Sequence, residues 1–148
     1  MAATSLVIEA TPEQVFQVLA DGWTYSDWVV GTVHIRDVGL GFPAPGTVLH
    51  HKVGPWPVSL HDNTRILICD PPRLLAMQAR LRPLGVATVT LTLEPQMADT
   101  TKVTMVEEFS AGPLKWLQTK ANDVVLHRRN TEALRRLSDI VVGRLRQH

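Results

Sequence analysis

The sequence has few of the features that mark specialised classes of protein. Its 148 residues include one cysteine, Cys69, so no internal disulfide and no zinc site of several thiolates can form. Cys69 ends an apolar run and is interpreted as a small packed residue, not as a catalytic nucleophile. With a formal net charge of +1, the chain also gives no reason to expect a nucleic-acid partner.

Long apolar runs are missing as well. No segment approaches the length of a membrane span, so we expect no integral membrane association. Residues 1–5 lack the features of a secretion signal, and we therefore expect a cytoplasmic protein. Hydrophobic residues make up 45% of the chain and charged residues 20%, which is typical of a globular protein. The length favours a single domain, 1–148, with a substantial core.

The beginning of the chain predicts a strand followed by two short helices. Leu6–Glu9 has the β-branched character of a strand. Thr11 can cap a helix, Pro12 suits its first position, and Gln14 completes a capping box. The aromatic segment 23–28 is interpreted as a second helical turn.

The middle of the chain predicts a series of strands separated by turns rich in glycine and proline. The expected strands are Thr32–Val38, Thr47–Val53, Val58–Cys69, Leu74–Leu81, Val86–Glu94 and Lys102–Phe109. Their short connections favour antiparallel hairpins. Alternation along the strands then predicts the inward side chains, which are Leu49, His51, Val53, Leu75, Met77, Ala79, Leu81, Ala87, Val89, Leu91, Leu93, Val103, Met105, Glu107 and Phe109.

The last third, Gly112–His148, predicts one long helix. After Pro113 the pattern contains no further glycine or proline until Gly143. A sheet followed by one long helix predicts an α+β fold in which the helix covers the apolar face of the sheet. A wide sheet under one helix can leave space between them, and this space is where we expect the functional site.

The long helix carries two apolar stripes on roughly opposite faces. One consists of Leu114, Leu117, Ala121, Val124 and Val125. The other consists of Leu134, Leu137, Val141 and Leu145, and it continues backwards through Asn130, His127, Asp123 and Trp116. The sequence leaves open which face of the front half is buried. Burial of the polar face makes sense if a cavity, a ligand or water satisfies its hydrogen-bonding groups.

The order and spacing of several short segments resemble the START-like (SRPBCC) superfamily, which includes polyketide cyclase/dehydrase-like proteins and the birch-pollen allergen fold. The matching residues are Thr11–Phe16 with Leu19 and Asp21, Trp28–Val29, Asp70–Leu74, Val86–Glu94, Thr101–Thr104, Glu107–Glu108, Gly112–Pro113, and Arg129–Asn130 with Leu134 and Leu137. The resemblance implies a helix-grip fold, in which a curved antiparallel sheet of about seven strands wraps around a long C-terminal helix, with two short helices after the first strand. It also implies a hydrophobic cavity between sheet and helix. Members bind lipids, sterols, polyketides or plant hormones, and some catalyse cyclisation or dehydration.

An inward carboxylate makes Glu107 the leading catalytic candidate, with His127 second. With His51 and His127, Glu107 could form an acid–base set for an enolisable ligand. The structural alternative is that Glu107 lies at the wet end of its strand and pairs with arginine or lysine. His50 and His51 point to opposite faces of a strand, so we expect no metal site with His61, and no cofactor.

Aromatic side chains gather near the expected loops. Core packing is the expected role of Trp28, and Trp23 is a further candidate for it. Trp56 lies between two prolines at a hairpin tip, where we expect either a lid over the cavity or a partner contact.

Three functions are compatible with these features. The leading hypothesis is a protein that binds, transports or sequesters a small hydrophobic molecule such as a lipid or polyketide. The expected ligand-binding residues are Tyr25, Leu49, His51, Trp56, Met77, Leu91, Met105, Glu107, Trp116, His127 and Asn130. The second is a polyketide cyclase or aromatase in which Glu107 or His127 acts as general base. The third is an interaction module, toxin-like regulator or homodimer that uses an exposed stripe of Leu114, Leu117, Val124 and Val125.

Overall fold

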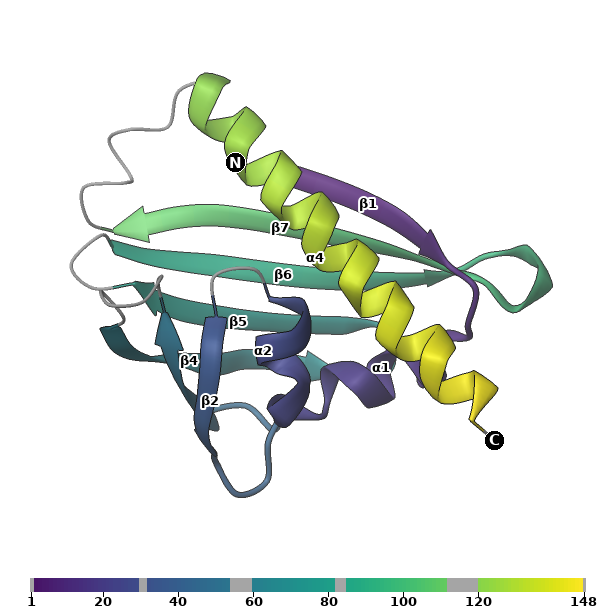
Figure 1. Ribbon diagram of the computed structural model, residues 1–148, viewed down its shortest axis with the longest axis horizontal. Helices are drawn as coiled ribbons and strands as arrows, with labels where there is room; N and C mark the ends of the chain where they lie inside the picture. Colours follow the sequence, from purple (N-terminus) through teal and green to yellow (C-terminus); the bar gives the residue numbers. More distant parts are fainter. Residues whose placement is uncertain (1, 30–31, 54–59, 82–84, 112–119, 148) are drawn as a thin grey trace.

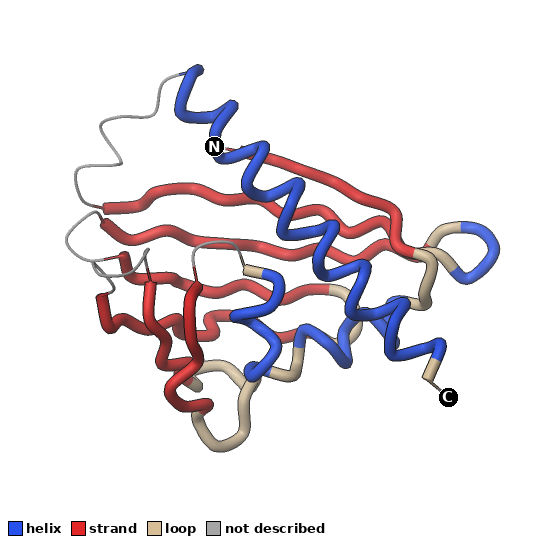
Figure 2. Tube along the Cα trace, viewed as in Figure 1, coloured by secondary structure: helices blue, strands red, loops and turns tan. Residues whose placement is uncertain are grey.

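A seven-stranded antiparallel sheet has a long helix lying diagonally across one face (Figure 1). The computed structural model describes residues 2–29, 32–53, 60–81, 85–111 and 120–147. The elements are β1 (Ala2–Ile8), α1 (Pro12–Leu19), η1 (Gly22–Thr24), α2 (Tyr25–Trp28), β2 (Thr32–Val38), β3 (Val48–Val53), β4 (Leu60–Asp70), β5 (Leu74–Leu81), β6 (Gly85–Pro95), η2 (Met97–Asp99), β7 (Thr101–Ala111) and α4 (Lys120–Arg146). The short helices α1, η1 and α2 share the face that α4 covers (Figure 2). The predicted α+β helix-grip fold is therefore confirmed.

The capping box predicted at the start of α1 is present. Thr11 Oγ1 accepts a hydrogen bond of 3.2 Å from the backbone N–H of Gln14, and Gln14 Oε1 accepts one of 2.9 Å from the N–H of Thr11. Pro12 occupies the start of the helix, as its fixed φ and missing N–H allow. These local interactions fix where the chain turns from β1 into α1.

The sheet order is β1-β7-β6-β5-β4-β3-β2, so neighbouring strands are consecutive in sequence except at β1, which pairs with β7. The strand bounds agree with the prediction to within a few residues, apart from β1, which begins at Ala2 rather than Leu6. The predicted inward residues are buried or partly buried wherever their side chains are described; those of Val53 and Leu81 are not.

β4 departs from regular alternation at a register shift between Ile66 and Ile68. Ile66 is buried, whereas Leu67 and Ile68 are both exposed, at 41% and 50%. A bulge adds one residue to a strand and so reverses which side chains face inward beyond it. Cys69 returns to the inner face and packs against the core, as its interpretation as a small packed residue predicts.

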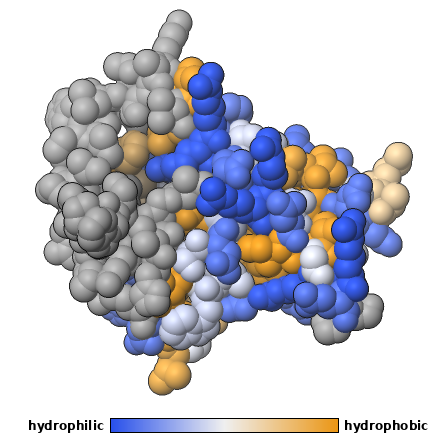
Figure 3. Space-filling model, in the orientation of Figure 1, coloured by the Kyte–Doolittle hydropathy of each residue, from blue (hydrophilic) through white to orange (hydrophobic). Residues whose placement is uncertain are grey.

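The buried face of α4 extends from Leu126 to Val141. It consists of Leu126, Asn130, Ala133, Leu134, Leu137 and Val141, which are 5% exposed or less. Val124 lies on the other side and is 52% exposed. The surface that α4 presents to solvent is mainly hydrophilic (Figure 3). Asn130 of the second predicted stripe therefore faces inward, whereas His127 and Leu145 of that stripe are exposed.

The buried apolar residues of the described ranges fall into two groups. The larger group packs α1, α2 and the second half of α4 against the sheet and includes Val15, Leu19, Leu93 and Leu137. The smaller group consists of Ala87, Phe109 and Leu126. We call the part of the interior at the larger group the apolar end. The part around the smaller group, together with Glu107, Asn130, His51 and Thr64, we call the polar end.

Candidate ligand-binding site

Strand register places the inward residues of the polar end in two adjacent rows together with neighbours from the larger apolar group. One row crosses the sheet through Phe109, Ala87, Ala79, Thr64 and Leu49. The next row contains Glu107, Val89, Met77 and Ile66. Polar and apolar side chains are therefore mixed on the inner face of this end of the sheet, because alternation carries both kinds inward.

Glu107 on β7 forms an ion pair with Arg129 on α4. Glu107 is 4% exposed, whereas a third of the Arg129 side chain, 32%, remains accessible. Burying a lone carboxylate is costly, and a guanidinium partner offsets much of that cost. The predicted pairing with a basic residue is thus present, but Glu107 is buried rather than at a wet strand end.

The predicted acid–base residues have separate partners. His51 is 3% exposed, and its Nε2 lies 2.9 Å from Thr64 Oγ1. His127 is exposed on α4, and its Nδ1 lies 3.0 Å from Oγ1 of Thr4 on β1. The three candidates therefore anchor three different places: β3 to β4, α4 to β1, and α4 to β7.

Asn130 differs from these residues. It is 2% exposed, and its side-chain nitrogen Nδ2 is buried without a hydrogen-bond partner in the part of the chain that the structure describes. It lies one turn after Leu126 of the smaller apolar group and just before Ala133 and Leu134 of the larger one. A buried donor without a partner lowers the stability of the folded protein by roughly 1–3 kcal/mol. An apolar side chain could fill the same position without that cost.

Tyr25 is a packed structural residue whose hydroxyl is already occupied. The hydroxyl donates a 3.0 Å hydrogen bond to the carbonyl of Leu19, and the ring lies 4.9 Å from Trp28 and 5.7 Å from Phe42 between centroids. Burial raises the pKa of the Tyr25 hydroxyl well above its ordinary value. Trp28 is 1% exposed, so its predicted core role is confirmed.

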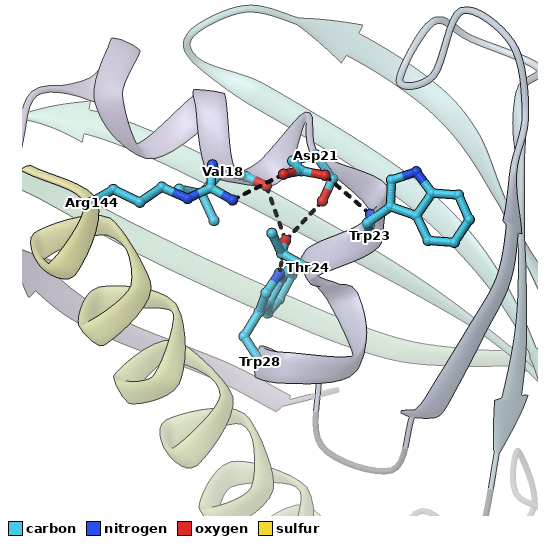
Figure 4. Close-up of polar contacts among 6 residues, drawn as sticks. All are labelled: Val18, Asp21, Trp23, Thr24, Trp28 and Arg144. Atoms are coloured by element: carbon cyan, nitrogen blue, oxygen red, sulfur yellow. Dashed lines mark hydrogen bonds and ion pairs between the residues drawn. The ribbon is translucent and has the colours of Figure 1, made fainter. Parts of the chain in front are cut away.

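The short helices are held to the end of α4 by polar contacts (Figure 4). Arg144 donates a 2.9 Å hydrogen bond to Asp21, and the Thr24 hydroxyl donates to the carbonyl of Asp21 at 2.8 Å. Trp28 Nε1 donates in turn to Thr24 Oγ1 at 3.3 Å. Trp23 is 56% exposed, so it does not pack in the core.

The apolar candidates lie on the inner face of the sheet. Leu49, Met77, Leu91 and Met105 are all 5% exposed or less. Trp56 and Trp116 lie outside the described residues, as do Leu114 and Leu117 of the predicted interaction stripe.

Sequence reasoning missed the role of Arg129. The residue precedes Asn130 and follows Leu126 by three positions, so helical spacing puts it at the edge of the buried face. This edge position was the signal that the sequence offered, and it did not identify Glu107 as the partner. Thr64 and Thr4, the partners of the two histidines, carried no comparable signal because threonine is common in strands.

A surface groove of about 410 Å³ lies outside the sheet–helix interior. It is lined by the first residues of α1, by the β4–β5 turn at Pro72 and Arg73, and by the segment around η2. It contains none of the predicted site residues.

The described parts of the chain lack two further kinds of feature. No group of three or more histidine, cysteine, aspartate or glutamate side chains there could hold a metal ion. None of the helices described is both long and apolar enough to cross a membrane.

The chain is similar to a family of known proteins along almost its whole length. The family model described as polyketide cyclase/dehydrase and lipid transport matches residues 2–141. No curated protein sequence matches the chain significantly.

Solved structures share the fold at low sequence identity. The ZhuI aromatase/cyclase from Streptomyces sp. R1128 superposes with a TM-score of 0.74 at 17% identity, over 97% of this chain and 94% of that one. Protein NE0264 from Nitrosomonas europaea gives a TM-score of 0.71 at 14% identity, over 99% and 97% of the two chains. Ara h 8.0201 gives 0.69 at 12% identity, over 95% and 96%.

Proposed function

Because the chain belongs to the polyketide cyclase/dehydrase and lipid transport family, we propose that it binds a small hydrophobic molecule at the polar end of its interior, beneath the front half of α4. The observation that carries this proposal is the buried side-chain nitrogen of Asn130, which has no hydrogen-bond partner among the described residues. A bound molecule would supply the missing partner and so remove the cost of burying that donor.

The residues around Asn130 would bind different parts of the ligand. Leu49, Met77, Leu91 and Met105 of the larger apolar group present their side chains on the same inner face. Where they border the polar end, they would supply most of the affinity. Glu107 and Asn130 would border the polar part of the ligand. His51 lies on β3 at the same end of the interior, where its Nε2 is 2.9 Å from Thr64 Oγ1.

The remaining candidates have smaller parts in this proposal. Tyr25 would contribute its ring and not its hydroxyl, since the hydroxyl donates to Leu19. His127 would border the site from α4 while bonded to Thr4. Trp56 and Trp116 stay predicted lining residues, and cyclase or aromatase activity stays a prediction as well.

The proposal can be tested by filling the interior from the sheet side. Ala87 is 1% exposed and points inward beside Phe109 and Leu126, whereas its neighbour Thr88 belongs to the opposite face. We expect Ala87→Leu to weaken binding of a neutral solvatochromic probe, 6-propionyl-2-dimethylaminonaphthalene, by at least tenfold. The matched variant Thr88→Leu should leave probe binding within about twofold of wild type.

Stability of the same variants shows whether the interior has room. In a filled core, Ala87→Leu would cost about 1–3 kcal/mol of unfolding free energy because extra methylenes force strain. With room for a ligand, we expect a loss below about 1 kcal/mol in urea unfolding. A wild-type protein that takes up no probe and releases no small molecule on solvent extraction would contradict the proposal.

A further inference from the structure

The charged groups buried in the interior point to the kind of ligand that fits. Among the described residues, Glu107 is the buried charged side chain, and Arg129 already forms an ion pair with it. The other buried polar side chains are those of threonines, His51 and Asn130. The polar end therefore offers a ligand the neutral amide donor of Asn130. Its described charged pair, Glu107 and Arg129, is already engaged in an ion pair.

We infer that the ligand of the proposed site is an uncharged molecule with a carbonyl-type hydrogen-bond acceptor, and that this acceptor binds the side-chain N–H of Asn130. The inference rests on the proposed function and adds the chemistry of the ligand's polar group. An amide N–H is a donor, so the group that completes it must be an acceptor, as ketone, ester and lactone oxygens are.

A charged ligand would fit the described site less well. A carboxylate at Asn130 would find no free partner in Arg129, the next residue back along α4, because Glu107 already engages that cation. An ammonium group would have to displace Arg129 from Glu107 and could not accept a hydrogen bond from Asn130. In both cases the charge would lose its water without a free partner.

Four probes that share one dimethylaminonaphthalene body can test the inference. They differ at position 6, which carries a propionyl, a propyl, a carboxylate or an aminomethyl group. We expect the propionyl ketone to bind wild-type protein roughly five- to tenfold more tightly than the propyl probe, as one neutral hydrogen bond to a buried donor predicts. The carboxylate and aminomethyl probes should bind more weakly than the ketone.

The variant Asn130→Leu has a similar volume and no donor. It should bind the ketone and the propyl probe equally, and its Tm should rise by about 2–5 °C because the unpartnered donor is gone. A second variant, Asn130→Ser, keeps a hydroxyl donor and should keep part of the preference for the ketone. It also provides the test if Asn130→Leu does not fold.

The outcomes separate this inference from the proposed function. A ketone preference that vanishes in Asn130→Leu supports the inference. A preference that survives in Asn130→Leu, equal binding of all probes, or tightest binding of a charged probe would overturn it while leaving hydrophobic binding intact. Binding of none of the four probes, together with release of no small molecule on solvent extraction, would overturn the proposed function itself.

Discussion

At the apolar end of the interior, Thr24, Tyr25 and Thr101 each donate a hydrogen bond to a backbone carbonyl. At the polar end, Asn130 is buried to the same degree and keeps a donor without a partner. Both ends lie under the same helix and against the same sheet. At the apolar end these buried donors are paired within the chain. At the polar end, the Asn130 donor has no partner among the described residues and could bind another molecule.

The ion pair of Glu107 with Arg129 fits this contrast. A buried pair adds little net stability compared with apolar residues of similar volume, so its presence at the polar end is not explained by stability. The apolar end contains no buried ion pair among its described residues, and its polar contact with α4, Arg144 with Asp21, lies at the surface. We interpret the polar end as the part shaped for a ligand.

The largest expected effect compares one leucine from each end. Leu137 is fully buried in the larger apolar group, and Leu126 is 5% exposed in the smaller one. We expect Leu137→Ala to cost about 4 kcal/mol of unfolding free energy and Leu126→Ala about 2 kcal/mol, because fewer packed neighbours are lost at the polar end. Urea unfolding measures both. Equal losses would contradict the division of the interior.

A smaller effect is expected from breaking the ion pair. Arg129→Leu leaves the Glu107 carboxylate buried without its partner and should cost about 3 kcal/mol at neutral pH. The double variant Glu107→Leu/Arg129→Leu should recover most of that loss. The exposed pair of Arg136 with Glu132 offers a matched control, and Arg136→Leu should change stability by less than about 0.5 kcal/mol. If the double variant is no more stable than Arg129→Leu, the pair is not the source of the loss.

The smallest effect concerns Tyr25 at the apolar end and depends on pH. Tyr25→Phe should cost about 1–2 kcal/mol at neutral pH, because the Leu19 carbonyl loses its donor. Burial raises the pKa of this hydroxyl in the folded state, so only the unfolded chain releases the proton above about pH 10. Wild-type stability should therefore fall above that pH, by up to about 1.4 kcal/mol per pH unit from this group.

Tyr25→Phe lacks this titrating hydroxyl. The difference in unfolding free energy between wild type and Tyr25→Phe should therefore become smaller as the pH rises from 9 to 11. Urea unfolding across that range measures the gap. A gap that stays constant or widens would mean that Tyr25 titrates in the folded protein as it does in the unfolded chain.

Sequence periodicity was sufficient for the sheet and for some of the candidate residues. Alternation alone places Glu107 and His51 inward, and both are buried. It fails past Ile66, where the bulge in β4 exposes Ile68, because a single added residue reverses the parity and leaves no mark in the local pattern.

The buried face of the long helix could not be predicted from local sequence patterns. The helix has two apolar stripes, and the sequence did not decide which of them is buried. Periodicity shows that one face of a helix is more apolar than another, but it does not show which face packs against the sheet. Packing of Leu126 with Phe109 and Ala87 decided between them. The outward Val124 could not have been assigned from the helix alone.

The sequence by itself determined the strands, the capped first helix and the helix that covers the sheet, because turns, caps and periodicity act over a few residues. Tertiary structure alone decided that Arg129 joins Glu107, that Thr4 meets His127 across 123 positions, and that Asn130 is enclosed without a partner. Those outcomes depend on how the helix packs on the sheet. A polar side chain costs free energy when it lacks a partner only after this packing has excluded water from it.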